Sequence, residues 1–351
     1  MLKLGILGAG RVVQNRYVDV FQHELKNVKV TKVCDLVQKN ANDVADSLSA
    51  EAVYSSEALF TSKDISTILI ATESGKHYEH TKKALSEGKH VIVEKPPTLL
   101  PDQIVELEEM ARTKGLMYAV IFQNRFNPAI RILKKTFDTG RLGKIVTNSI
   151  RLRWCRYQEY YEDGWHGTWK MDGGVINQQA IHHVDALQWI CGPVISVCAA
   201  QTNILNKLEA EDTHVAILRF VSGALGIVEA TTAARPKDYE ASISIVGEKG
   251  MAVINGIALN KIDTWEFVDS IPEDKIIPSQ YSQEVPTGYG LSHGPLIQEI
   301  VDRLQTGNIK PPITGTDALP TVQLVHALYK SDELNGWVDL KNTPISGRLG
   351  I

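Results

Sequence analysis

The chain has few of the features that mark secreted, membrane-bound or metal-binding proteins. Its 351 residues include only four cysteines, and their spacing suits neither a disulfide framework nor a metal site, so we expect free thiols and no bound metal. No apolar run approaches the ~20 residues that a membrane-spanning helix needs. The N-terminus also lacks the pattern of a signal peptide. We therefore expect a cytoplasmic protein with no membrane partner.

The chain also lacks an excess of charge of either sign. Lys and Arg together number 37 and Asp and Glu 41, which leaves a net charge of −4. Without a dominant positive field, nucleic acid is not expected as a partner. Apolar residues make up 43%, enough for sizeable cores. At ~150 residues per domain, the length corresponds to about two domains.

Strand and helix patterns alternate through the first 122 residues. Short runs rich in Val and Ile are typical of strands buried on both faces. The expected strands are 3–7, 28–33, 66–71, 90–93 and 117–121, and the expected helices are 11–24, 39–48, 76–87 and 101–114. This alternation predicts parallel strands joined by right-handed crossovers, as in a doubly wound α/β sheet.

After Phe122 the pattern changes to longer strand candidates that mostly follow one another directly. These are 144–157, 196–203, 214–220, 224–233 and 240–246, with helical patterns at 127–137, 181–190 and 296–304. Consecutive strands without crossover helices favour a second, mostly antiparallel sheet. We expect an α/β chain of two domains, residues 1–122 and 123–351.

A glycine-rich loop follows the first expected strand. Gly8-Ala9-Gly10-Arg11-Val12-Val13 opens a helix, and backbone N–H groups at a helix N-terminus can hold a pyrophosphate. Val13 stands where a third glycine is usual. Asp35 ends the second strand, where a carboxylate binds ribose hydroxyls and repels a 2′-phosphate. The pattern predicts NAD, held by Gly8, Gly10, Arg11, Val12 and Asp35; the alternative is a tight turn without a ligand.

Lys95 follows another buried strand, within Glu94-Lys95-Pro96. Ligands of open α/β sheets bind beyond the carboxyl ends of the strands, so Lys95 is expected to face the cleft. Its ammonium could stabilise a developing alkoxide, and burial could lower its pKa toward that of a usable acid or base. The alternative is a surface lysine in an ion pair.

A second candidate group lies between Asp172 and Asp185. Helical spacing would place Gln178, His182 and Asp185 on one face. His182 could accept a proton near neutral pH, and Asp185 could orient it or cap local structure. Gln178 could orient a hydroxyl but cannot take its proton, so the catalytic base would be His182 or Lys95. The alternative is a histidine packed in the core.

These segments resemble the Gfo/Idh/MocA family of nicotinamide-dependent sugar and cyclitol oxidoreductases. The resemblance spans nearly the whole chain and is carried by residues 8–11, 71–72, 77, 88–90, 94–96, 125–128 and 172–185. It implies an N-terminal Rossmann domain and a C-terminal α/β domain whose large, mostly antiparallel sheet serves substrate binding and assembly into a homodimer or homotetramer. It matches Lys95 and His182 to the family's active-site lysine and histidine. It adds Thr72, His77, Glu94 and Lys95 to the cofactor-binding candidates.

The chain departs from the family pattern at three positions. Glu73 replaces a usual proline, Asp172 a usual glycine and Gln178 a usual aspartate. The last change removes an ionisable group from the expected catalytic set of Lys95, His182 and Gln178.

The substrate is suggested by arginines and aromatic residues at 151–161 and 165–169, which suit phosphate pairing and stacking. This segment resembles the branch of the family that oxidises C3 of UDP-N-acetylglucosamine-type sugars, as do residues 177–178 and 292–295. The substrate-binding candidates are Lys95, Arg125, Arg153, Tyr157, Trp165, Trp169, Asn177, Gln178, His182 and His293. Alternatively, the aromatic residues pack the sheet, and Arg151 and Arg153 share a solvated face.

The expected function is therefore NAD-dependent oxidation of a sugar hydroxyl to a ketone. A free-sugar or inositol dehydrogenase is the alternative within the same fold. A catalytically silent protein that senses NAD is a second alternative.

Overall fold

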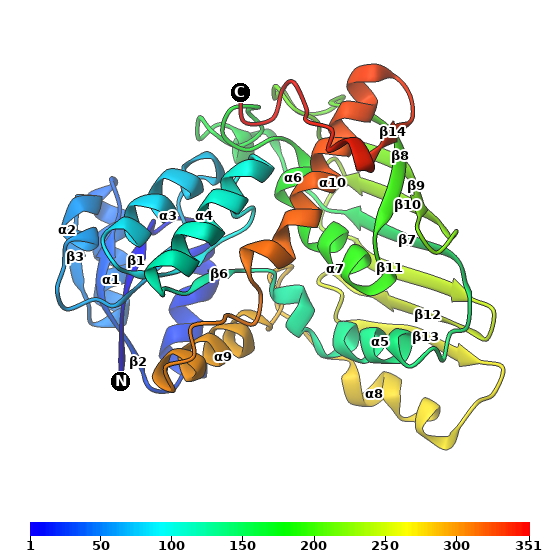
Figure 1. Cartoon of the computed structure of the whole chain (residues 1–351), viewed down its shortest axis with the longest axis horizontal. Coiled ribbons are helices and arrows are strands. Elements are labelled where there is room, and N and C mark those ends of the chain that lie inside the picture. Colours follow the sequence, from blue (N-terminus) through cyan, green and yellow to red (C-terminus); the bar gives the residue numbers. More distant parts are fainter. The chain divides into compact units, whose positions relative to one another are not determined.

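The computed structural model describes all residues from Met1 to Ile351, and they form two compact units (Figure 1). The first unit comprises Met1–Phe122 and Ser292–Leu319, and the second comprises Gln123–Leu291 and Pro320–Ile351. Helix α9 (His293–Gln305) thus belongs with the first unit, where it packs on the strand β1 (Leu2–Leu7) and the helical turn η2 (Val20–Glu24). The predicted boundary at residue 122 puts this helix in the second domain, because an amphipathic pattern does not show which sheet the apolar face will cover.

The first unit is built on a parallel six-stranded sheet in the order β3-β2-β1-β4-β5-β6. Its strands are β1 Leu2–Leu7, β2 Val28–Cys34, β3 Glu51–Val53, β4 Thr67–Ile70, β5 His90–Val93 and β6 Tyr118–Val120. The connecting helices are α1 Gln38–Leu48, α2 Ser56–Phe60, α3 His77–Ser86 and α4 Pro101–Lys114. The predicted doubly wound sheet is confirmed.

The helix after the glycine loop has an unusual form. Two wide π-helical turns, η1 (Val13–Tyr17) and η2 (Val20–Glu24), replace most of the regular helix expected over 11–24. Such turns are rare in proteins overall, but those that occur are often found at functional sites. Val13 and Tyr17 are fully buried, so these turns direct them into the core of the unit.

The second unit contains an eight-stranded sheet in the order β13-β12-β11-β7-β10-β9-β8-β14. Its strands are β7 Ile145–Arg153, β8 Val194–Thr202, β9 Thr213–Phe220, β10 Leu225–Thr231, β11 Glu240–Gly247, β12 Gly250–Asn255, β13 Lys261–Phe267 and β14 Val338–Asp339. Only β7 and β10 pair in parallel. The large, mostly antiparallel sheet is therefore confirmed.

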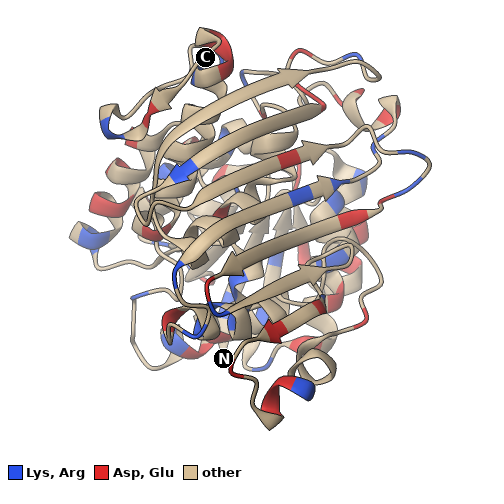
Figure 2. Ribbon diagram, turned by 90° about the vertical axis from the view of Figure 1, so that its right-hand side faces the viewer, with Lys and Arg blue, Asp and Glu red and all other residues tan.

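Helices cover one face of this sheet. They include α5 Pro128–Asp138, α6 Val175–Gln178 and α7 Ile181–Cys191, and α7 packs on β7 and β11. Along β9 and β10, buried and exposed residues alternate, so Val215, Ile217 and Ile227 point to the uncovered face. Figure 2 shows the strands from this open face.

The remaining helices are α8 Ile277–Tyr281 and the long α10 Gly315–Leu334. None of the helices combines the length and the apolar composition that crossing a bilayer requires. All four cysteines are free thiols.

Candidate active site

The glycine loop has the geometry that a dinucleotide requires. Gly8 has φ +92°, and a Cβ there would lie 2.5 Å from the Ala71 carbonyl oxygen, so a larger residue would clash. A Cβ on Gly10 would meet no atom within 4 Å, which leaves its backbone open to a ligand. The residues present therefore fit the predicted pyrophosphate site.

Asp35 also shapes this loop. Its carboxylate accepts hydrogen bonds from the backbone N–H groups of Ala9 at 2.7 Å and Val37 at 2.8 Å. A carboxylate has about four lone-pair sites, so two bonds leave capacity for ribose hydroxyls. The second role, holding the loop that follows β1, was not foreseen from the sequence.

The segment that carries Lys95 is held by its neighbours. Glu94 is 5% exposed and accepts hydrogen bonds from the Tyr17 hydroxyl at 2.5 Å and the Lys95 N–H at 3.1 Å. Burial raises the pKa values of Glu94 and Tyr17. Tyr17 lies in η1, so the helix after the glycine loop is tied directly to the segment around Lys95.

His77 supports the other side of this segment. Its Nδ1 lies 2.7 Å from the Pro96 carbonyl oxygen, and its Nε2 lies 3.0 Å from that of Thr72. Burial is the main cause that lowers the pKa of His77 to about 4, and the hydrogen bonds to the Pro96 and Thr72 carbonyls act against it. The structure thus shows Glu94 and His77, both predicted to bind the cofactor, in contacts that hold the backbone beside Lys95.

His293 is buried in the same region of the first unit. Its ring packs edge-on against Tyr17, with centroids 5.5 Å apart. Burial, followed by the positive charges of Arg16 and Lys95, lowers the pKa of His293 to about 3. The side chain of His293 is almost fully enclosed, and its Nδ1 has no hydrogen-bond partner.

In the second unit, a tight turn precedes α6. Gly173 has φ +77°, and a Cβ on Gly174 would lie 2.1 Å from the Glu211 carboxylate. That carboxylate accepts hydrogen bonds from the Ile176 N–H at 3.0 Å and the Tyr329 hydroxyl at 3.1 Å. Burial raises the pKa of Glu211 to about 8. Glu211 and Tyr329 fix the entry to α6, and no local pattern links these distant residues to it.

Gln178 is held by a second buried carboxylate. Its Nε2 donates to Asp172 Oδ1 at 2.6 Å, and Asp172 Oδ2 accepts from the Gly167 N–H at 3.0 Å. Because an ionised carboxylate can only accept hydrogen bonds, the amide nitrogen of Gln178 must face Asp172. The amide oxygen is then directed away from Asp172, which suits it to accept a bond from a hydroxyl. Asn177 donates to the Asp172 carbonyl oxygen at 2.5 Å and is buried.

The single helical face expected for Gln178 and His182 does not form. Helix α6 ends at Gln178 and α7 begins at Ile181, so the chain changes direction between them. His182 stands in the first turn of α7, half-buried, with Nε2 3.4 Å from the amide nitrogen of Gln123.

The expected partnership of His182 with Asp185 is also wrong. Asp185 is completely buried and accepts two hydrogen bonds from Arg125, at 2.8 and 2.7 Å, and one from Thr321 at 3.0 Å. Its carboxylate is therefore committed to Arg125. This bidentate pair leaves Arg125, a predicted substrate ligand, only 10% exposed.

The aromatic and basic candidates for substrate binding separate into two groups. Arg153 lies on the open face of the sheet and pairs with Glu229 at 2.6 Å and Glu240 at 3.3 Å. A cavity of about 470 Å³ lies beside it. Its lining is largely charged and comprises Arg151, Arg153, Tyr239, Glu240, Asn255, Gly256, Ile257, Lys261 and Asp263. Because Arg153 is neutralised by two carboxylates, it is a poor candidate for a phosphate ligand.

The other group is aromatic. Trp165 packs on His166 with ring centroids 3.6 Å apart, and Trp169 packs edge-on against Tyr329 at 5.0 Å. Tyr157 is exposed, and the guanidinium of Arg235 lies 4.4 Å from its ring centroid. Of the three, Tyr157 presents the most open ring.

Comparison with known proteins supports this picture. Residues 2–122 match the oxidoreductase family with an NAD-binding Rossmann fold, and residues 130–253 match the GFO/IDH/MocA C-terminal domain. The chain is similar to the WlbA dehydrogenase from Bordetella pertussis, solved in complex with NADH and UDP-GlcNAcA. That comparison has a TM-score of 0.88 and 29% identity, and covers 96% of this chain and 97% of the other.

Relatives with other substrates are also similar. The NAD(+) scyllo-inositol 2-dehydrogenase of Bacillus subtilis is 26% identical over 72% of this chain and 73% of its own length. The D-glucoside 3-dehydrogenase of Escherichia coli is 29% identical over 54% of each chain. With the two family matches and the Rossmann unit, these findings show that the chain belongs to the Gfo/Idh/MocA family and is an NAD-binding oxidoreductase.

Proposed function

We propose that this protein oxidises the C3 hydroxyl of a UDP-N-acetylglucosamine-type nucleotide sugar to a ketone. The observation that carries the proposal is the similarity, at 29% identity and over 96% of the chain, to a dehydrogenase solved with NADH and UDP-GlcNAcA. Levoglucosan dehydrogenase covers this chain to the same extent at only 18% identity, which indicates the fold alone.

The residues of each unit have distinct parts in this reaction. Gly8, Gly10, Arg11, Val12 and Asp35 hold the cofactor, with Thr72 beside the loop. Bound there, NAD would supply the acceptor for the hydride that leaves the carbinol carbon. The other bond that breaks is the hydroxyl O–H, and its proton goes to a group of the protein.

His182 receives that proton, since histidine is the side chain most often used as a general base near neutral pH. The Lys95 ammonium stabilises the negative charge that develops on the oxygen. The oxygen of Gln178, oriented by Asp172, accepts a hydrogen bond from a substrate hydroxyl and so fixes the sugar. Lys95 and Gln178 thus act on charge and orientation, while His182 takes the proton.

A free-sugar or inositol dehydrogenase is the second candidate, favoured by the similarity to scyllo-inositol 2-dehydrogenase across most of the chain. The same catalytic residues would serve it. The difference lies in whether a uridine diphosphate group contributes to binding.

Thermal unfolding in the presence of NADH separates the candidates. A ligand that binds only the folded state raises the midpoint, whether or not product accumulates. We expect UDP-N-acetylglucosamine or its uronic acid to raise the midpoint well beyond UDP alone. Protection by inositol or free hexoses, but not by nucleotide sugars, would overturn the proposal.

A further inference from the structure

We propose that Arg156 and Arg235, with the ring of Tyr157, form the subsite that binds the diphosphate of a nucleotide-sugar substrate. We call these three residues the arginine subsite. The inference rests on the proposed function and extends it by assigning the residues that would distinguish a nucleotide sugar from a free sugar.

Arg153 and Arg156 lie on opposite sides of the sheet. Arg153 ends β7 on the open face, paired with carboxylates. The next residue, Trp154, is buried and packs edge-on against His183 of α7, with centroids 6.0 Å apart. The guanidinium of Arg156 lies 5.2 Å from the Trp154 ring centroid, so it belongs to the side covered by α7. His182 also lies in α7.

Arg156 has hydrogen-bond donors that a ligand can use. Arg156 donates from Nη1 to the Cys155 carbonyl at 2.7 Å and to Asp238 at 2.9 Å. Its Nε and Nη2 donate to no protein atom, although only 23% of the side chain is exposed. These two donors have the fork geometry that binds a phosphate in a bidentate manner.

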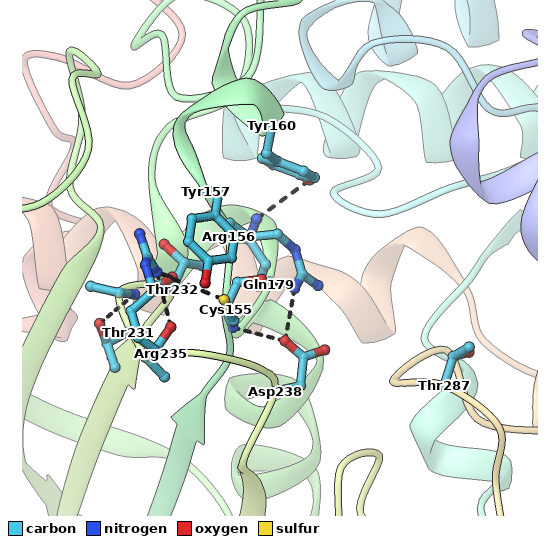
Figure 3. A network of polar contacts seen from close by, with 12 residues as sticks. Cys155, Arg156, Tyr157, Tyr160, Gln179, Thr231, Thr232, Arg235, Asp238 and Thr287 are labelled. Carbon is cyan, nitrogen blue, oxygen red and sulfur yellow. Dashed lines mark hydrogen bonds and ion pairs between the residues drawn. The ribbon is translucent and has the colours of Figure 1, made fainter.

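The positive charge of Arg235 is not paired with a carboxylate. Arg235 donates to the backbone carbonyls of Thr232 at 3.2 Å and Ala234 at 2.9 Å, and no carboxylate pairs with it. These bonds fix the guanidinium without neutralising it. Asp238 is the one carboxylate paired with this cluster, and Arg156 uses it. Figure 3 shows Arg156, Tyr157, Arg235 and Asp238 together where β7 and β10 end.

Contacts through Tyr160 and Gln179 connect Arg156 to the proposed reaction centre. Gln179 donates weakly to the Tyr160 hydroxyl, at 3.4 Å, and Gln179 directly follows Gln178. The guanidinium of Arg156 lies 5.5 Å from the Tyr160 ring centroid. The arginine subsite is thus joined through two side chains to the segment that would orient the sugar.

A diphosphate matches this arrangement because it carries two adjacent anionic groups, one for each guanidinium. Tyr157 offers an exposed ring on which a base or a sugar can stack. A nucleic acid would need a wider basic surface, and the net charge of the chain is −4.

The test measures binding of UDP and of inorganic pyrophosphate by calorimetry with NADH present. We expect Arg156→Gln and Arg235→Gln each to weaken UDP binding by about 10- to 100-fold, the loss of a charged hydrogen-bond pair. Arg151→Gln, on the open face, is the matched control and should bind UDP as the wild type does. Added NaCl should weaken UDP binding to the wild type more than to either subsite variant.

Folding and charge are controlled separately. All variants should keep the midpoint increase that NADH produces, and Arg235→Lys should keep part of the affinity because it retains the charge without the fork. Equal UDP binding by the wild type and both Gln variants would overturn the subsite, even if UDP-sugars are turned over. Pyrophosphate binding that depends on both arginines, without turnover of UDP-sugars, would support the subsite and reject the proposed substrate.

Discussion

Lys95 and His182 stand in two segments that are built differently. Lys95 follows the parallel strand β5, and the backbone beside it is held by Glu94, Tyr17 and His77. His182 lies in the first turn of α7, which follows the turn at Gly173, the short helix α6 and a two-residue turn at 179–180. In the first segment, the carboxyl end of a strand in the parallel sheet sets the position of Lys95. In the second, side chains distant in the sequence set the position of His182.

The two segments also differ in how their buried acids are stabilised. Glu94 accepts hydrogen bonds from a phenol and a backbone N–H, and the charge of Lys95 lowers its pKa against the effect of burial. Glu211 has donors but no cation among the causes that shift its pKa, which reaches about 8. The stability of the second segment should therefore depend more strongly on pH than that of the first. Turnover should depend on residues of both segments.

A large loss of turnover is expected from Lys95→Ala. Removing a preorganised positive charge at a developing oxyanion typically costs about 10²–10³-fold in turnover. NADH binding should remain, since Gly8 and Asp35 are untouched, and the NADH-induced midpoint increase would verify this. Undiminished turnover of the UDP-sugar would reject the role of Lys95.

His182→Asn should lower turnover by about 10²–10⁴-fold, the usual contribution of a general base. The pH profile of turnover separates this role from a structural one. The wild-type rate should rise with pH as an imidazole loses its proton, and the variant should lose that dependence. If the variant keeps the same pH profile, Lys95 rather than His182 is the base.

Asp172→Asn should have a smaller effect, about 10-fold on turnover, because it removes a charge-assisted hydrogen bond behind the reacting groups. An asparagine can donate as well as accept, so it no longer dictates which end of the Gln178 amide faces it. We expect KM for the sugar to rise and KM for NAD to stay constant. Equal changes in both constants would indicate a general loss of structure instead.

The fold could largely be predicted from the sequence, because strands buried on both faces leave continuous apolar runs. The parallel sheet and most helices of the first unit follow from this. The two-residue β14 and the short β3 carry too little pattern, and β12 and β13 mix polar with apolar residues. The position of α9 depends on tertiary packing, which local periodicity does not encode.

The candidate site was less accessible to prediction. Spacing suggests that Asp185 should meet His182, but Arg125, 60 residues away, satisfies that carboxylate more completely. The alternation of side chains that continues past β7 puts Arg153 and Arg156 on opposite sides of the sheet. Which of the two sides is covered by helices does not follow from the sequence. Glu211 supports α6 from the loop that precedes β9, more than 30 residues along the chain, so no spacing rule connects them.

The smallest expected effect concerns stability, and it tests the pH dependence of the second segment. The Glu211 carboxyl keeps its proton to about pH 8 in the folded protein, whereas an ordinary Glu has a pKa of 4.5. Between these values the folded state holds more protons than the unfolded state, so the stability from this group is full below about pH 4.5 and is lost as pH rises through 8.

Glu211→Gln mimics the protonated form and should remove this loss. Its unfolding midpoint, relative to the wild type, should therefore be higher at pH 8.5 than at pH 6.0, by about a few degrees. A midpoint difference that is the same at both pH values would show that Glu211 is already ionised in the fold, and the contrast with Glu94 would disappear.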